Sequence, residues 1–219
     1  MRHRFLILFL LILMNGALNA QIIITTPYEY SAGVSSGVTL SSVSFNPKVT
    51  QEMLQGFTFG VIGRMTMGEN VGLQIELNFA QQGWKEFIEE QPEYQYNRTI
   101  NYLQFPFYTR MQFGSKKVKG FFNAGPQVGY ALGESTKQNT DGLFPSFTTV
   151  QHEMPVTQKF EWGISGGIGL EFRTAIGYFL IEGRYLYSFS DIYSTKRKDY
   201  FGKASSQVFT VRASYLIPF

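Results

Sequence analysis

The 219-residue sequence contains no cysteine. That absence excludes disulfide bonds, a thiolate metal site and a lipid-attachment cysteine. Histidine is nearly absent too, since the chain has only His3 and His152. A Ser-His-acid triad would depend on His152, with Glu153 and either Ser146 or Thr148 near it in the sequence. Adjacent loop residues point in different directions and a lone loop histidine is expected to be solvated, so the sequence favours a non-enzymatic protein.

Long apolar runs are also scarce, and the one that exists is at the N-terminus. Residues 5–14 are uninterrupted apolar residues, with two arginines before them and small residues after them. This layout predicts a secretory signal peptide over residues 1–20, with Gln21 as the first residue of the mature chain. The run is short against the roughly 20 residues of a membrane-spanning helix, and no second such run follows it.

An excess of charge of either sign is missing as well. Loss of the two arginines of the signal peptide leaves 17 of the 19 basic side chains against 16 acidic ones. Nucleic acid is therefore not an expected partner, because its binding needs a clustered excess of lysine and arginine. The chain is instead rich in aromatic residues, at 16%, and in glycine, with 22 residues. This composition behind an export signal favours a β-protein of the Gram-negative cell envelope.

Alternation of apolar and polar residues recurs along the mature chain. In the stretch "NVGLQIELNFAQ", Ile75 and Leu77 point to one face of a strand, and Glu76 between them points to the other. Similar stretches are bounded by turn residues, and eight strands are predicted in all. They are expected at residues 29–43, 56–67, 70–81, 100–113, 120–132, 160–173, 178–189 and 208–219.

The predicted connections alternate strictly between short and long. The short ones read "GEN", "GSKK" and "TAIG", and the long ones cover residues 44–55, 85–98, 133–159 and 190–206. Bacterial outer-membrane barrels have an even number of strands, short periplasmic turns and longer extracellular loops. The sequence therefore predicts an all-β fold, an eight-stranded antiparallel up-and-down transmembrane β-barrel. We assign residues 21–29 to a short N-terminal lead and residues 30–219 to the barrel.

The two faces of the strands are expected to meet different surroundings. Lipid requires an apolar face, so residues such as Ile75 and Leu77 should face the membrane. The polar faces would then line a narrow lumen, where charges of both signs are expected to pair, because an isolated buried ion is costly. The predicted lumen-facing charged cluster comprises Arg64, Glu76, Arg110, Glu161, Glu171, Arg173, Glu182, Arg184 and Arg212.

The end of the sequence carries a separate signal. The last predicted strand has apolar residues at alternate positions and terminates on an aromatic side chain, with Tyr215, Ile217 and Phe219 in register. This ending resembles the C-terminal signal of outer-membrane proteins that the barrel-assembly machinery reads. That machinery is therefore an expected partner, together with outer-membrane lipid and lipopolysaccharide.

Five blocks of the sequence resemble, in order, those of the PorT-type outer-membrane β-barrel family. They read "LQIELNFAQQGWK", "INYLQFPFYTRM", "GFFNAGPQVGYAL", "FEWGISGGIGLEF" and "EGRYLYSFSDI". The resemblance extends from about Tyr30 to Phe219. It implies a small barrel of the outer membrane. Through the name-giving member of the family, it also implies an accessory role in type IX protein secretion.

Three functions follow from these observations. The first is a non-enzymatic barrel with a plugged lumen, which meets envelope or secretion partners through residues 133–159 and the basic residues 195–203. The second is a narrow passive pore for small solutes, lined by Arg64, Arg110, Arg184, Glu76 and Glu182. The third is a soluble periplasmic lipocalin-like binder, which would need an apolar lumen.

No cofactor or metal site is predicted. The glycines of "GISGGIG" lie between strands, whereas a dinucleotide loop leads from a strand into a helix. An acidic run comprises Glu86, Glu89, Glu90 and Glu93. It lacks the fixed ligand spacing of a calcium loop and is expected to be a solvated charge run. Lys196, Arg197, Lys198 and Lys203 form a basic loop that could contact anionic lipopolysaccharide.

Overall fold

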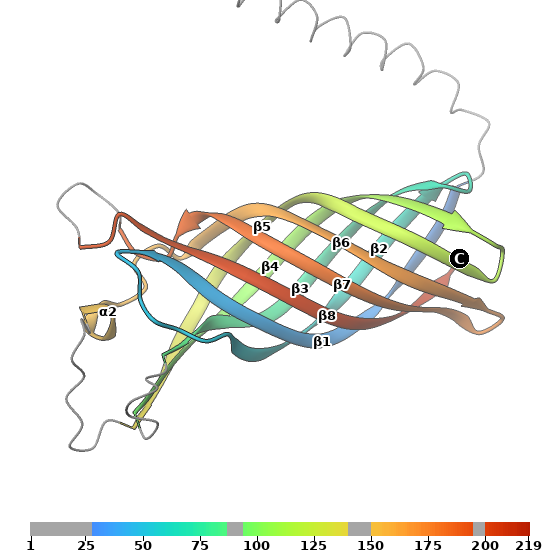
Figure 1. The fold of residues 1–219 in the computed structure, drawn as a ribbon. Coiled ribbons are helices and arrows are strands. Elements are labelled where there is room, and N and C mark those ends of the chain that lie inside the picture. The colour runs from blue at the N-terminus through green and yellow to red at the C-terminus, as the bar shows by residue number, and fades with distance from the viewer. Residues whose placement is uncertain (1–27, 87–93, 140–149, 195–199) are drawn as a thin grey trace, which may run out of the picture.

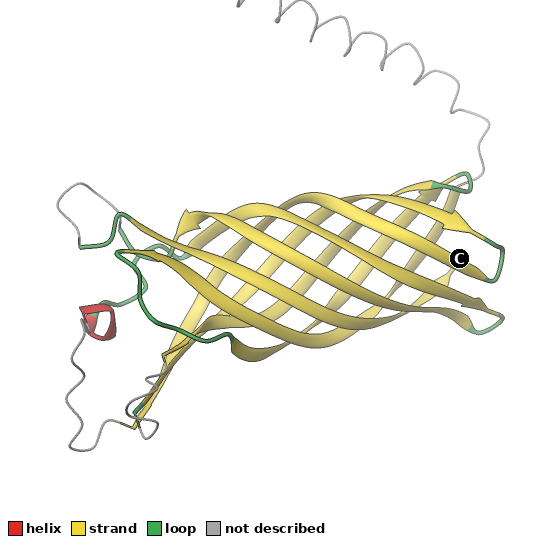
Figure 2. Cartoon of the chain, viewed as in Figure 1, coloured by secondary structure: helices red, strands yellow, loops and turns green. Residues whose placement is uncertain are grey.

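Eight antiparallel strands close into one barrel in the computed structural model, which describes residues 28–86, 94–139, 150–194 and 200–219. Each strand pairs with its neighbours in the sequence, and the first pairs with the last (Figures 1 and 2). The predicted fold class is confirmed. The strands are β1 (Tyr28–Asn46), β2 (Leu54–Met67), β3 (Val71–Glu86), β4 (Gln95–Gly114), β5 (Val118–Asn139), β6 (Phe160–Thr174), β7 (Gly177–Asp191) and β8 (Lys203–Pro218).

The connections separate the two ends of the barrel. Residues 68–70, 115–117 and 175–176 form short turns at the end where the C-terminus lies, which we name the short-turn end. The longer connections meet at the opposite, long-loop end, beside the short helix α2 (Val150–Glu153) (Figure 1). This is the sorting of turns and loops that the sequence predicts. In outer-membrane barrels the short turns face the periplasm and the long loops face outside.

Only one of the predicted domain boundaries, the start of the barrel, can be compared with the described residues. Strand β1 begins at Tyr28, two residues before the predicted start of the barrel. The predicted signal peptide, residues 1–20, lies outside the described residues and stays a prediction. Within the described ranges, no helix is long and apolar enough to cross a membrane.

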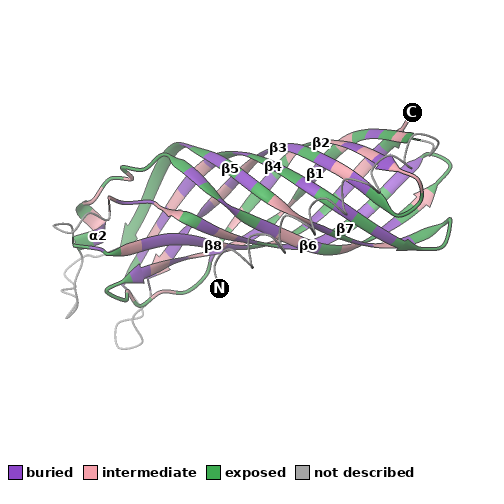
Figure 3. Ribbon diagram, turned by 90° about the horizontal axis from the view of Figure 1, so that it is seen from above, coloured by how far each residue is buried: buried purple, intermediate pink, exposed green. Residues whose placement is uncertain are grey.

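Burial alternates along the strands, and the exposed side is the apolar one (Figure 3). In β3, Ile75 is 45% exposed and Leu77 is 44% exposed, whereas Glu76 between them is 2% exposed. A water-soluble protein would bury the apolar set and expose the acid. The reverse arrangement suits a barrel whose outer face contacts lipid and whose interior holds polar groups. It rules against the soluble lipocalin-like alternative, which requires an apolar lumen.

Strands β3, β4, β5 and β8 extend five residues or more beyond their predicted ends toward the long-loop end, and β8 begins at Lys203 instead of residue 208. Strand β3 runs to Glu86, β4 starts at Gln95, and β5 ends at Asn139, so parts of the predicted loops 85–98 and 133–159 are strand. The β4–β5 pair continues from Asn101 opposite Gly133 to Gln95 opposite Asn139. All side chains of β5 from residue 132 to 139 are exposed. Because neither face is buried there, the period-two pattern that marks a strand disappears from the sequence.

Candidate functional site

The interior of the barrel holds a compact group of charges, the Glu76 cluster, made of Glu76, Glu182, Arg184 and Arg212. Arg184 donates to both carboxylate oxygens of Glu76 at 2.9 Å, and Arg212 donates to Oε2 at 2.7 Å. Gln74 and Asn78, two residues to either side on β3, also donate to Glu76, at 2.6 and 2.8 Å. Five hydrogen bonds therefore hold one buried carboxylate, which is how a buried charge is stabilised.

Glu182, the second acid of the Glu76 cluster, balances the charge of its second arginine. Glu182 accepts from Arg184 at 2.8 Å and from Asn123 at 2.9 Å. Two carboxylates thus face two guanidinium groups from strands β3, β7 and β8, and the cluster is neutral. The Arg184 guanidinium also lies 4.4 Å from the centre of the Tyr108 ring, a cation–π distance. The cluster joins β3 to β7 and β8 across the barrel through buried ion pairs, which salt screens much less than exposed ones.

A second group of charges, the Glu171 cluster, lies toward the short-turn end. Glu171 accepts from Arg64 at 2.5 Å and Arg110 at 2.6 Å on Oε2, and from Arg173 at 2.7 Å on Oε1. Arg173 also pairs with Glu29 at 3.3 Å. Three arginines from β2, β4 and β6 therefore meet on one fully buried carboxylate.

Apolar side chains also point inward, so the predicted polar interior is only part of what fills the barrel. Ile62, Phe121, Leu180 and Leu216 are buried and pack together with Tyr178 around the Glu171 cluster. The guanidinium carbon of Arg110 lies 3.7 Å from the centre of the Phe121 ring. Stacking of a guanidinium on an aromatic face lets charged and apolar groups share one narrow lumen.

Glu161 departs from the expectation that charges of both signs pair. It is 4% exposed, and among the described residues no arginine or lysine forms an ion pair with it. The side-chain amide of Gln82 donates a hydrogen bond to it across 3.5 Å. The predicted charged cluster of nine residues is thus two paired groups and one isolated acid.

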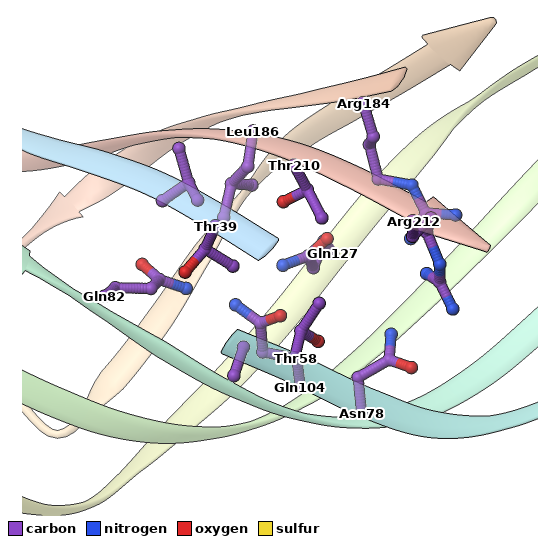
Figure 4. A pocket seen from close by; sticks show the side chains of 12 residues that line it. Thr39, Thr58, Asn78, Gln82, Gln104, Gln127, Arg184, Leu186, Thr210 and Arg212 are labelled. Atoms are coloured by element: carbon purple, nitrogen blue, oxygen red, sulfur yellow. The ribbon is translucent and has the colours of Figure 1, made fainter. Parts of the chain in front are cut away.

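A small polar cavity lies beside the Glu76 cluster (Figure 4). Its volume is about 20 Å³, and its lining includes Arg184 and Arg212 on one side and Gln82 and Gln104 on the other. A cavity of this size holds roughly one water molecule. The side-chain amide oxygens of Asn78 and Gln82 are buried without a hydrogen-bond partner in the described structure. A water in the cavity could donate to them.

An apolar cluster that the sequence analysis did not predict lies at the long-loop end of the barrel, and we name it the outer cap. Trp84 is fully buried at its centre, 5.2 Å from the ring of Phe45 and 6.4 Å from that of Tyr193. The cluster draws on strands β1, β3, β4, β5 and β8 and on the segment after β7. Its members are Val43, Phe45, Trp84, Tyr94, Tyr96, Ile100, Tyr102, Ala131, Ile192, Tyr193, Phe201 and Ala204.

Hydrogen bonds fasten helix α2 to the outer cap. Glu86 accepts from the Trp84 indole at 2.9 Å and from Gln151 at 3.1 Å, and lies 2.7 Å from His152 Nε2. Arg98 donates to the carbonyl of Gln151 at 2.9 Å and to that of Met154 at 2.6 Å. Residues 151–154 of the connection between β5 and β6 are therefore held against the outer cap by one acid and one arginine.

Burial also sets the protonation state of one phenol in the outer cap. Burial, with a smaller contribution from the nearby Glu86 carboxylate, raises the pKa of Tyr94 to about 12. Desolvation disfavours the charged form of any phenol. Tyr94 is therefore neutral throughout the physiological pH range, and it adds no charge to the mouth of the barrel.

Two expectations about these loops are wrong. His152 is not solvated: it pairs with Glu86, and its ring stacks on Tyr96 with 3.6 Å between ring centres. Glu86 is not part of a solvated acidic run, because it belongs to β3 and is 1% exposed. Glu89, Glu90 and Glu93 lie outside the described residues, and so do Ser146, Thr148, Lys196, Arg197 and Lys198.

A sequence signal for the cap did exist. The inward positions of β3 run through Gln74, Glu76 and Asn78, and the same even-numbered series continues to Gln82, Trp84 and Glu86. Tyr96, Arg98 and Ile100 alternate in the same way at the start of β4. Large or charged residues at every second position beyond a predicted strand end indicate that the strand continues and that one face is buried.

The C-terminal residues take positions on the outer wall. Ile217 is 55% exposed and Phe219 is 80% exposed, and Tyr215 on the same face packs 5.0 Å from Phe179. The amide of Phe219 donates to the carbonyl of Tyr30 at 2.9 Å, so the last residue still pairs with β1. Recognition of this ending by the assembly machinery stays a prediction.

Metal-binding chemistry finds no support in the ranges described. There, no group of three or more histidine, aspartate or glutamate side chains is arranged to hold a metal ion.

Lys203 of the predicted basic loop starts β8 and donates to the Tyr187 hydroxyl at 3.3 Å.

A closed ring of eight strands with an apolar outside and a charged inside defines a transmembrane β-barrel of the outer membrane. A family model described as "Outer membrane protein beta-barrel domain" matches residues 19–194, and the chain belongs to this family. No curated protein matches it.

One solved structure has the same fold with a TM-score above 0.5, and two others are similar at lower TM-scores. The chain is similar to Neisserial surface protein A, with 12% identity, a TM-score of 0.51 and coverage of 87% of this chain and 97% of that one. OprG of Pseudomonas aeruginosa is 10% identical, with a TM-score of 0.46 and coverage of 87% and 95%. Ail of Yersinia pestis is 15% identical, with a TM-score of 0.43 and coverage of 86% and 99%.

Proposed function

We propose that this protein is a non-enzymatic, non-conducting barrel of the outer membrane that acts through partners at its ends, as an accessory of protein secretion of the PorT type. The observation that supports the non-conducting part is the series of side-chain clusters inside the barrel. The Glu171 cluster, the Glu76 cluster and the outer cap follow one another along the barrel, and each contains side chains from several strands.

The energetic reason for closure is the pairing of the charges. A solute crossing the lumen would have to separate Glu76 from Arg184 and Arg212, or Glu171 from its three arginines. Removing one partner from a buried ion pair costs about 3–5 kcal/mol. An eight-stranded barrel has an interior that side chains fill, so there is no parallel path around the pairs.

The secretion role rests on two supports. The five sequence blocks resemble the PorT-type family in order. A filled barrel is also suited to anchoring and displaying its ends, since the loop between β5 and β6 is held in place by Glu86 and Arg98.

Electrical measurement tests the closed lumen. The purified, folded barrel is expected to give no steady conductance after insertion into planar lipid bilayers, because both charge clusters block the path. A bilayer containing an open porin serves as the positive control for insertion and recording. A steady open level carried by the folded protein would favour the passive-pore alternative and overturn this part of the proposal.

Secretion is tested separately in the bacterium that encodes the chain. Deletion of the gene is expected to leave type IX cargo in the periplasm and lower its amount in the medium, and a plasmid copy should restore it. A complementing copy with Glu86→Gln, which loosens the outer loop without removing the barrel, shows whether the ordered loop matters. Unchanged cargo export in the deletion strain, with the barrel absent from its outer membrane, would contradict the accessory role.

A further inference from the structure

The short-turn mouth of the barrel carries more positive than negative charge. Around the Glu171 cluster, four cationic side chains face two carboxylates. The cations are Arg64, Arg110, Arg173 and Lys119, and the acids are Glu171 and Glu29. Lys116 and Glu69 at the rim cancel each other. The Glu76 cluster, by contrast, is neutral. The short-turn mouth therefore carries an excess of two positive charges, which the Glu76 cluster lacks.

Buried donors without partners accompany this excess. Each arginine of the Glu171 cluster uses one nitrogen on Glu171 and keeps one terminal nitrogen that finds no hydrogen-bond acceptor in the described part of the chain. These atoms are Arg64 Nη2, Arg110 Nη1 and Arg173 Nη2, and all three are buried. The cluster therefore has more charged donors than acceptors of its own, so its positive charge is not fully compensated within the described residues.

The mouth also has room for a ligand. A cavity of about 530 Å³ is lined by Arg173, Lys119, Tyr178 and residues of the three short turns. Lys119 is 9% exposed, and its ammonium donates to the Glu69 carbonyl at 2.8 Å. That ammonium has three donors in all. A nearly buried lysine and a guanidinium thus face one space, with the other two arginines behind Arg173 on Glu171.

We propose that this mouth binds a phosphate group. Guanidinium and ammonium groups around a partly buried space are the donors that bind tetrahedral oxyanions, and a phosphate would supply acceptors and balance the excess charge. The Glu29 carboxylate, bonded to Arg173 and Tyr178, confines the anion to the lysine side of the cavity. The phosphate comes either from the periplasm as a free ion or from a phospholipid headgroup of the inner leaflet. This inference does not depend on the proposed function.

Ligand-dependent stability tests the site in the full-length mature protein in maltoside micelles, which contain no phosphate. Ligand that binds only the folded state raises its melting temperature. One arm adds sodium phosphate against sodium chloride of equal ionic strength, and the other adds phosphatidylglycerol to the micelles. A rise with phosphate supports the site with a free ion as ligand. A rise with phosphatidylglycerol alone supports it with the headgroup as ligand.

Variants separate this site from general salt effects. Lys119→Gln is expected to weaken the apparent affinity for the effective ligand roughly tenfold, since it removes one charged hydrogen bond. Lys203→Gln changes a lysine at the other end of the barrel and should keep the full response. Heat-modifiable gel mobility shows that each variant is folded, and Lys116→Gln, at the rim, provides a second test if Lys119→Gln does not fold. No rise with either ligand, or the same rise in Lys119→Gln as in the unchanged protein, would overturn the proposal.

Discussion

Glu76→Gln is expected to lower the free energy of unfolding by about 3–5 kcal/mol, the usual cost of breaking a buried ion pair from one side. The change keeps the shape of the side chain but removes its charge. Arg184 would retain the Glu182 carboxylate, whereas Arg212 would retain only neutral acceptors, such as the Ser35 hydroxyl. One guanidinium would thus be buried without a carboxylate. Urea unfolding of the barrel in lipid vesicles, followed by circular dichroism and by gel mobility, measures the loss.

Glu161→Gln is the matched control for this prediction. It makes the same chemical change at a carboxylate with the same degree of burial, 4% exposed against 2%. Glu161 forms no ion pair within the described residues, and its partner is the Gln82 amide. An amide there gives up no Coulomb attraction, so stability should stay within about 1 kcal/mol or rise. Equal losses in both variants would show that the pairing with arginine is not what holds Glu76.

The residues around Glu76 show how far the sequence reaches. Alternation alone places Ile75 and Glu76 on opposite faces, and the sorted turns identify a barrel, so the inward direction of Glu76 can be predicted. The choice of partner cannot. Arg184 and Arg212 are more than a hundred residues away, and which inward arginine meets Glu76 depends on the stagger of the strands. That stagger is a property of barrel closure, which the local pattern does not contain.

Burial in the outer cap could be predicted from the sequence only in part. Its residues come from five strands and from the segment after β7, and most lie where the sequence predicts loops. Trp84 and Glu86 continue the inward series of β3, so their burial could have been predicted. The position of α2 could not, because four residues carry no periodic pattern, and what holds the helix is Arg98 and Glu86 from other strands. Contacts between distant segments decide this end of the molecule.

Trp84→Ala is expected to lower the free energy of unfolding by about 3–5 kcal/mol, the range for large-to-small changes at fully buried aromatic residues. The change removes the rings' contacts with Phe45 and Tyr193 and the indole hydrogen bond to Glu86. Glu86 would keep His152 and Gln151, so α2 should loosen before the barrel opens. Limited proteolysis of intact cells should cut the loop between β5 and β6 faster in the variant.

The other tryptophan of the chain provides the comparison. Trp162 faces lipid, is 50% exposed and contacts Phe189 at 5.2 Å, so Trp162→Ala should cost only about 1 kcal/mol and leave the loop protected. The proposed function assigns closure of the lumen to the charge clusters, so on that proposal Trp84→Ala should also remain non-conducting in planar bilayers. A steady current in Trp84→Ala would mean that the cap, and not the paired charges, closes the barrel. A larger loss of stability in Trp84→Ala than in Trp162→Ala, without a current, would mean that the paired charges close the lumen. The cap would then serve to order the outer loop.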